Sequence, residues 1–143
     1  MISYHDGFLS RAQWAGFMPG ADRISLDSHP YLCFSTQSSA PLSSFINTPC
    51  SAWADSVNTS MTAFGLSAAG EFSNAVNDCG LYVNGVGLGT RYEGTYPGTS
   101  QSFGSCSDWL NWQSWDNSTK QEYMQFALTS MDALQVRALY ASG

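Results

Sequence analysis

The chain has 143 residues, which is enough for one domain with its own buried core. Only 11% of the residues are charged, the formal net charge is -6, and Lys and Arg together number 5, so the sequence excludes the basic surface that nucleic acid or an anionic membrane requires. The sequence also contains no apolar stretch of the length that a membrane-spanning helix needs.

The first predicted elements are a strand, a short helix and a second strand. The strand covers residues 1–5, and Ser10 is placed to cap a helix over residues 10–17. Met18-Pro19-Gly20 then breaks the chain, and residues 23–27 read as the second strand.

The remaining predicted elements follow a Ser- and Pro-rich loop over residues 35–48. They are a helix over residues 49–62, with Pro49 in its first turn, a third strand over residues 64–70, a long Gly-rich loop over residues 77–107, and a last helix over residues 118–134 capped by Ser118 or Thr119.

This order of elements predicts an α/β fold with about three βα units. A closed parallel barrel needs eight such units. Three strands alone leave two exposed sheet edges, which is a liability for a free domain.

Side chains suited to catalysis follow each predicted strand. His5 and Asp6 follow the first strand, His29 and Tyr31 the second, and Glu71 the third. If the strands are parallel neighbours, these side chains meet at one rim, where parallel barrels carry their chemistry. A carboxylate that attacks an anomeric carbon and a phenol that orients it suit glycoside hydrolysis. The alternative is that Glu71 faces solvent in an ordinary loop.

The cysteines and glycosylation motifs predict an extracellular protein. The four cysteines, Cys33, Cys50, Cys79 and Cys106, have no metal-ligand spacing, and only two histidines are present, so no metal site is predicted. A Cys79–Cys106 disulfide is plausible because a Gly-rich loop lies between them. Sequons begin at Asn58 and Asn117. Residues 1–6 are no secretory signal, so we expect a segment to precede them.

The sequence was also compared with the patterns of three other kinds of site: a sugar-stacking platform, a dinucleotide-binding loop and a serine hydrolase. Trp53, Trp109, Trp112 and Trp115 could form a sugar-stacking platform, although packing is the commoner role of a cluster such as the one over residues 109–115. The glycines over residues 85–89 lack the preceding strand and following helix of a dinucleotide loop. No Gly-X-Ser-X-Gly element is present, so a serine hydrolase is not predicted.

Taken together, the strand-end motifs resemble those of fungal exo-β-1,3-glucanases of glycoside hydrolase family 5, over about residues 2–134. The residues that carry the resemblance are Tyr4-His5-Asp6-Gly7-Phe8, Ala21-Asp22-Arg23, His29-Pro30-Tyr31-Leu32-Cys33-Phe34, Ala69-Gly70-Glu71-Phe72-Ser73-Asn74 and Asn77-Asp78-Cys79-Gly80.

The resemblance implies a partial (β/α)8 TIM barrel whose strands correspond to strands 5–7, and retaining hydrolysis of β-1,3-glucan with release of glucose and no cofactor. Glu71 matches the nucleophile, and His29 and Tyr31 match the pair that contacts the sugar and the nucleophile. Phe34 matches an aromatic residue at the site entrance. His5-Asp6 matches a supporting strand end.

The same resemblance implies a loop disulfide between Cys79 and Cys106, and a Cys50 whose partner lies further along the family's chain. It also implies secretion to the cell exterior or the cell wall.

The departures from the family pattern concern both ends of the chain. The family's general acid/base is a Glu after an Asn, and no Asn-Glu dipeptide occurs here. We therefore expect a C-terminal half fragment, with residues 1–134 as the partial barrel domain and residues 135–143 as a non-family tail. The missing barrel half is then a candidate partner. The alternatives are a non-catalytic β-glucan-binding remnant and a barrel fragment without function.

Overall fold

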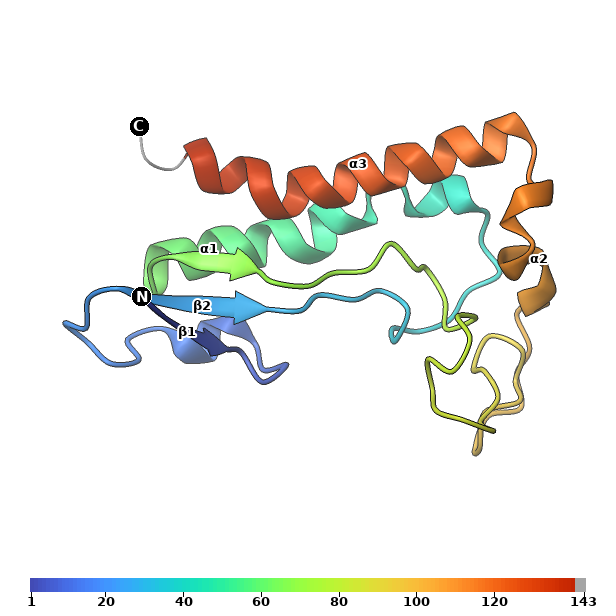
Figure 1. Cartoon of the computed structure of the whole chain (residues 1–143), viewed down its shortest axis with the longest axis horizontal. Coiled ribbons are helices and arrows are strands. Elements are labelled where there is room, and N and C mark those ends of the chain that lie inside the picture. The colour runs from blue at the N-terminus through green and yellow to red at the C-terminus, as the bar shows by residue number, and fades with distance from the viewer. Residues whose placement is uncertain (141–143) are drawn as a thin grey trace.

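The computed structural model describes the backbone of residues 1–140 and the side chains of residues 1–134. Its strands are β1 (Ile2–His5), β2 (Ile24–Ser28) and β3 (Ser67–Ala69), and its α-helices are α1 (Asp55–Ala63), α2 (Cys106–Leu110) and α3 (Asn117–Tyr140). The predicted α/β class is correct, because the three strands form one parallel sheet in the order β1-β2-β3 (Figure 1).

The central strand β2 fixes the register of the sheet. Leu26 pairs with Tyr4 of β1 and with Ser67 of β3, and the Leu26 side chain is fully buried. In the described part of the chain β1 and β3 each have one strand neighbour, so both are edge strands.

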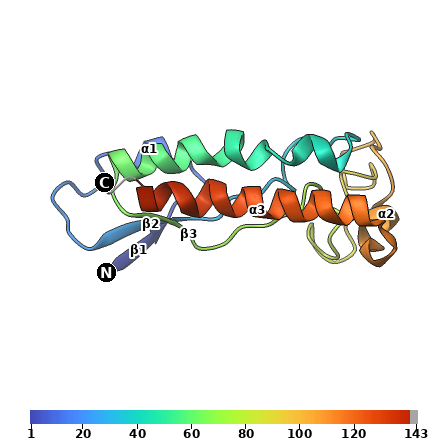
Figure 2. The same cartoon turned by 90° about the horizontal axis from the view of Figure 1, so that it is seen from above.

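Helices α1 and α3 run side by side and form a second layer over the sheet, which contacts β3 (Figures 1 and 2). The predicted helix over residues 49–62 is correct in extent: a π-helical turn, Cys50–Ala54, leads directly into α1. Within the described residues no helix combines the length and the apolar character needed to cross a membrane.

The core lies where α1, α3 and the connections between elements meet. Phe126 of α3 is fully buried at its centre. The other buried members of this cluster are Leu32, Leu42, Trp53, Val57, Val76 and Leu134. All of these buried residues come from loops and helices, so the helix layer packs mainly against the segments that follow the strands.

Two predicted elements are shorter in the structure than in the sequence prediction. The helix predicted over residues 10–17 is a single 3-10 turn, Arg11–Trp14, and the side chain of Ser10 makes no capping hydrogen bond. The third strand covers Ser67–Ala69 rather than residues 64–70, because Gly65 adopts a positive φ of 128° that interrupts extended structure.

The start of the last helix was also predicted wrongly. Asp116 caps α3, since its Oδ1 accepts a hydrogen bond of 2.8 Å from the backbone N–H of Thr119. This hydrogen bond lowers the pKa of Asp116. The helix continues through Tyr140, and residues 141–143 of the predicted tail lie outside the described residues, so the division at residue 134 stays a prediction.

The long loop after β3 is organised around one buried carboxylate, that of Asp78. The Asp78 side chain is fully buried and accepts hydrogen bonds from the backbone N–H groups of Arg91 (2.7 Å) and Tyr92 (3.0 Å) and from the side chain of Asn84 (2.8 Å). Burial alone would raise the pKa of Asp78, but these hydrogen bonds and the nearby charge of Arg91 outweigh it and lower the pKa.

A disulfide closes the same loop. The Sγ atoms of Cys79 and Cys106 are 2.04 Å apart, as the predicted pairing requires. The backbone N–H of Cys106 also donates to Glu93 at 2.8 Å. The loop is therefore fixed at both ends although most of it has no regular secondary structure.

We predict that Phe126→Ala destabilises the fold by about 3–5 kcal/mol, because it removes a fully buried ring from the centre of the core. Thermal denaturation followed by circular dichroism measures the effect. Met124→Ala on the same helix is the matched control, since Met124 is 62% exposed and its loss should leave the midpoint almost unchanged. Equal midpoints for the two variants would show that the core is not centred on Phe126.

We predict that Asp78→Ala loosens the long loop, at a cost of roughly 1–3 kcal/mol for each buried donor left without an acceptor. Limited proteolysis of residues 79–105 and thermal denaturation measure this, with the exposed Asp22→Ala as control.

The acid response of this carboxylate follows from its lowered pKa. Because the folded-state pKa lies below the unfolded-state value, the carboxylate stabilises the fold above the unfolded-state pKa. That contribution is lost as the pH falls through the folded-state value. Asp78→Asn should therefore lose less stability on acidification than the wild-type chain does.

Candidate active site

The parallel sheet brings the predicted strand-end residues to one rim. The carboxyl ends of the strands point toward the end of the molecule that carries the long loop and α2 (Figure 1). His5 ends β1, His29 directly follows β2, and Glu71 comes two residues after β3. Since neighbouring strands run in the same direction, their following residues lie side by side.

Glu71 and Tyr31 are joined by a direct hydrogen bond. The Tyr31 hydroxyl donates to Oε1 of Glu71, across 40 residues of sequence. This hydrogen bond is the main reason why the pKa of Tyr31 is raised to about 12, because ionisation would remove the proton that the carboxylate accepts. The phenol therefore stays neutral and holds one carboxylate oxygen in place at physiological pH.

His29 lies between two carboxylates. Its Nδ1 is 3.8 Å from Oε2 of Glu71, and its Nε2 is 3.5 Å from Oδ2 of Asp27. Its ring also packs edge-on against the ring of His5, with 4.5 Å between centroids. The imidazole is thus held on three sides, and 24% of its side chain remains accessible.

Asp27 has a second contact that reaches the chain beside Glu71. Its Oδ1 accepts a hydrogen bond of 2.7 Å from the backbone N–H of Gly70. Asp27 was predicted as part of the second strand, without a functional role. Its position two residues before His29, at the end of a strand, was the only available signal.

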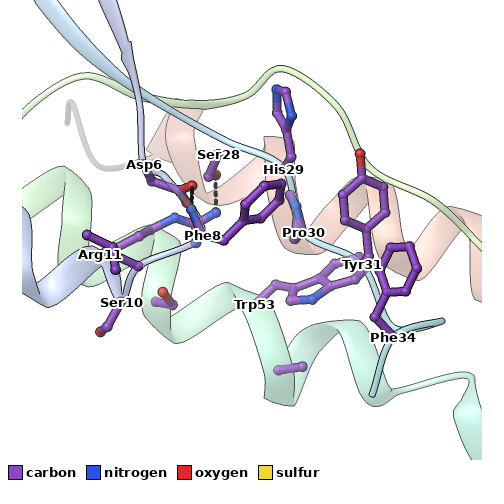
Figure 3. A pocket seen from close by; sticks show the side chains of 13 residues that line it. Asp6, Phe8, Ser10, Arg11, Ser28, His29, Pro30, Tyr31, Phe34 and Trp53 are labelled. Carbon is purple, nitrogen blue, oxygen red and sulfur yellow. Dashed lines mark hydrogen bonds between the residues drawn. The ribbon is translucent and has the colours of Figure 1, made fainter. Parts of the chain in front are cut away.

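A cavity of about 600 Å³ opens beside this cluster. His29, Tyr31 and Trp53 all line the cavity, and Figure 3 shows the rings of His29 and Tyr31 directed away from Trp53. Phe34 is 55% exposed and packs edge-on against Tyr31 at 5.7 Å between centroids. Phe8, which the resemblance motif contains but to which no role was assigned, is 72% exposed and also lines the cavity.

Two buried charged residues, Asp6 and Arg11, line the cavity. The sequence predicted a supporting role for Asp6 and no role for Arg11. Arg11 is only 8% exposed and donates a hydrogen bond to the Ser28 hydroxyl (Figure 3). Burial lowers the pKa of Arg11, and the negative charge of Asp6 opposes that shift. Asp6 itself accepts a hydrogen bond of 2.9 Å from the backbone N–H of Phe8. The local sequence does not single out Arg11 as buried, because its hydrogen-bond partner Ser28 lies 17 residues further along the chain.

The tryptophan cluster lies around α2 and the start of α3, and two of its members pack inward. Trp109 stacks edge-on against Tyr92 at 6.3 Å and against Trp115 at 5.9 Å, between ring centroids. The indole N–H of Trp115 donates to the Asp108 carbonyl at 2.7 Å. Trp112 is 57% exposed. The predicted packing role therefore holds for Trp109 and Trp115.

No group of three or more His, Cys, Asp or Glu side chains that could hold a metal ion occurs within the part of the chain that the structure describes.

The disulfide partners Cys79 and Cys106 lie in the long loop and line a separate, smaller cavity. Of the other two cysteines, Cys33 is buried and Cys50 is exposed.

Comparison with known proteins finds fungal relatives that are named glucan 1,3-beta-glucosidase. The chain is 36% identical over 100 residues to the probable glucan 1,3-beta-glucosidase D of Aspergillus fumigatus, covering 66% of this chain and 12% of that protein. The Aspergillus terreus protein of the same name is 36% identical over 119 residues, covering 74% of this chain and 14% of that protein. The glucan 1,3-beta-glucosidase of Lachancea kluyveri is 28% identical over 144 residues, covering 96% of this chain and 32% of that protein.

The chain thus spans about an eighth of the length of the first two relatives and about a third of the yeast protein. No protein-family model matches the chain.

We predict that the raised pKa of Tyr31 depends on the charge of Glu71. In Glu71→Gln an amide replaces the carboxylate, so the negative charge that disfavours ionisation is lost and the pKa of Tyr31 should fall from about 12 toward its ordinary value of 10.0. The measurement is a phenolate absorbance titration, in which Tyr31→Phe identifies the contribution of Tyr31. An unchanged titration in Glu71→Gln would show that the hydrogen bond does not control this phenol.

Proposed function

Since the chain is homologous to a segment of fungal glucan 1,3-beta-glucosidases, we propose that it carries the nucleophile side of a retaining β-glucosidase site of glycoside hydrolase family 5. The proposed substrate is β-1,3-glucan or a gluco-oligosaccharide, with release of glucose. In this proposal β1, β2 and β3 correspond to strands 5–7 of a (β/α)8 barrel. The parallel sheet with its helix layer supports this assignment.

The observation that carries the proposal is the Glu71 carboxylate with the Tyr31 hydroxyl bound to one oxygen and His29 beside the other. A retaining glycosidase needs an ionised carboxylate held in a fixed orientation. Tyr31 supplies that orientation because its pKa, raised to about 12, keeps the hydroxyl a neutral hydrogen-bond donor at physiological pH. Glu71 then attacks the anomeric carbon, and the glycosidic C–O bond breaks as the covalent glucosyl intermediate forms. Water subsequently releases glucose and restores the carboxylate.

The proton for the leaving oxygen has to come from a second carboxyl group, about 5–5.5 Å from the first in retaining enzymes. Asp27 already accepts from Gly70, and Asp6 already accepts from Phe8. No Asn-Glu dipeptide occurs in the 143 residues. We therefore propose that the general acid/base belongs to the remaining part of the barrel, which this chain does not contain.

Aromatic side chains at the rim would contact the sugar. Phe34 and Phe8 are both exposed beside the cavity, and apolar ring faces pack against the C–H faces of glucose. His29 and Tyr31 add polar groups at the same rim. The low content of charged residues, 11%, suits a neutral polysaccharide.

We also propose that the protein acts outside the cell or in the cell wall. The Cys79–Cys106 disulfide persists in oxidising compartments. Both sequon asparagines, Asn58 and Asn117, are exposed, as glycosylation requires.

A second candidate function is binding of β-glucan without hydrolysis. The observation in its favour is that the aromatic rim is present while the Asn-Glu dipeptide is absent. This function needs Phe34 and Tyr31 as contact residues but does not need the Glu71 carboxylate.

We predict that 2,4-dinitrophenyl 2-deoxy-2-fluoro-β-glucoside forms one covalent adduct on Glu71. Dinitrophenolate departs without protonation, so the absence of the general acid does not by itself prevent attack by the nucleophile. Intact-mass measurement followed by peptide mapping locates the adduct. Glu71→Gln should abolish labelling, and Glu122→Gln should retain it, because Glu122 lies on α3, away from the rim.

The other outcomes separate the two candidate functions. Absence of an adduct, with a full-length relative labelled under the same conditions, contradicts the nucleophile assignment. If insoluble β-1,3-glucan still captures both the wild-type chain and Glu71→Gln, the binding function is the one supported.

A further inference from the structure

The carboxylate of Asp27 contacts two neighbours of Glu71. One is the backbone of Gly70, which precedes Glu71, and the other is the side chain of His29, which lies beside the Glu71 carboxylate. Oδ1 accepts a hydrogen bond of 2.7 Å from the N–H of Gly70, the residue immediately before Glu71. Oδ2 lies 3.5 Å from Nε2 of His29, whose Nδ1 faces Glu71. A single side chain of β2 thereby links the loop after β3 to the imidazole after β2.

The fit between Asp27 and Gly70 leaves no room for a side chain on the glycine. A Cβ added to Gly70 would lie 2.8 Å from Cγ of Asp27 and closer still to its oxygens. Real Cβ atoms essentially never approach other atoms so closely, and the carboxylate has little freedom to move because both of its oxygens are engaged.

The backbone conformation at position 70 does not require a glycine. Gly70 is absent from the residues with positive φ, so its backbone conformation is open to an ordinary L-residue. The space that Asp27 occupies is therefore the reason why alanine does not fit, and removal of the Asp27 side chain should remove the conflict.

We propose that Asp27 is a positioning residue for the nucleophile. It fixes the backbone in front of Glu71 and the orientation of His29, and it makes no contact with substrate itself. This inference rests on the proposed role of Glu71. A displacement of about 1 Å at a reacting group can cost on the order of 100-fold in rate, so a clamp on the adjacent peptide has a direct kinetic effect.

The test compares the rate of covalent labelling by 2,4-dinitrophenyl 2-deoxy-2-fluoro-β-glucoside at saturating reagent in the wild-type chain and three variants. Asp27→Ala removes the clamp and should slow labelling by on the order of 10- to 100-fold. Asp27→Asn keeps an oxygen acceptor for Gly70 in the same place and should recover most of that loss. Asp22→Ala, an exposed aspartate before the other end of β2, should label as fast as wild type.

A double-mutant cycle isolates the packing between the two residues. Gly70→Ala alone should slow labelling strongly, because its Cβ collides with the Asp27 carboxylate. In the Asp27→Ala background the collision is gone, so Gly70→Ala should add almost nothing. Additive losses, or equal rates for Asp27→Ala and Asp27→Asn, would overturn the proposal. Thermal midpoints measured in parallel separate loss of positioning from loss of fold.

A measurement without reagent keeps the two proposals distinguishable. The Gly70 amide signal in a 1H–15N spectrum is identified by its absence from Gly70→Ala. The Gly70 amide hydrogen should exchange slowly with solvent in wild type and in Asp27→Asn, and rapidly in Asp27→Ala. If wild type does not label but this pattern holds, the nucleophile assignment fails and the clamp stands. If labelling occurs but exchange at Gly70 is the same in all three proteins, the clamp fails and the nucleophile assignment stands.

Discussion

The parallel pairing of β2 with β1 and β3 is the constraint on which the candidate site depends. Register places His5 opposite Asp27 and Asp27 opposite Ala68, so the residues that follow these positions emerge at one rim. If any one strand paired antiparallel, its carboxyl end would lie at the opposite rim of the sheet, away from the carboxyl ends of the other strands. Buried Leu26 anchors the central strand, and the distance from Asp27 to Gly70 is set by this register. The Tyr31 to Glu71 hydrogen bond therefore joins segments that the sheet has already brought together.

Asp78 and Asp27 show how the role of an aspartate depends on how deeply its side chain is buried. Asp78 is fully buried, accepts several N–H donors and organises a loop of irregular structure. Asp27 is 27% exposed and distributes its two oxygens between a backbone amide and an imidazole. The first arrangement lowers a pKa and stabilises the fold. The second leaves a charged group at a rim open to solvent, where it orients neighbouring groups.

Sequence reasoning predicted the parts of the fold that depend on local pattern. The parallel strands and the helix around α1 follow from apolar runs separated by Pro and Gly. The cap of α3 was missed because four residues of capping type stand in a row over residues 116–119, and only the geometry selects Asp116. Arg11 and Asp27 were missed for a different reason: their partners, Ser28 and Gly70, are distant in sequence, and no local pattern encodes such contacts.

The distance between the two carboxyl groups of a retaining glycosidase makes the proposed reaction depend on the curvature of the sheet. Neighbouring strands are about 4.8 Å apart, so a strand added beside β1 in a flat sheet would lie roughly 14 Å from β3, three spacings away. The family resemblance implies that the acid/base follows the strand before β1, whereas the two carboxyls must approach to about 5–5.5 Å. Only a sheet that curves back on itself brings these strand ends across from each other. In the proposed barrel, closure of the sheet and assembly of the second half of the site are consequently one physical requirement, while the contacts of Glu71 with Tyr31 and His29 are already made beside the three strands.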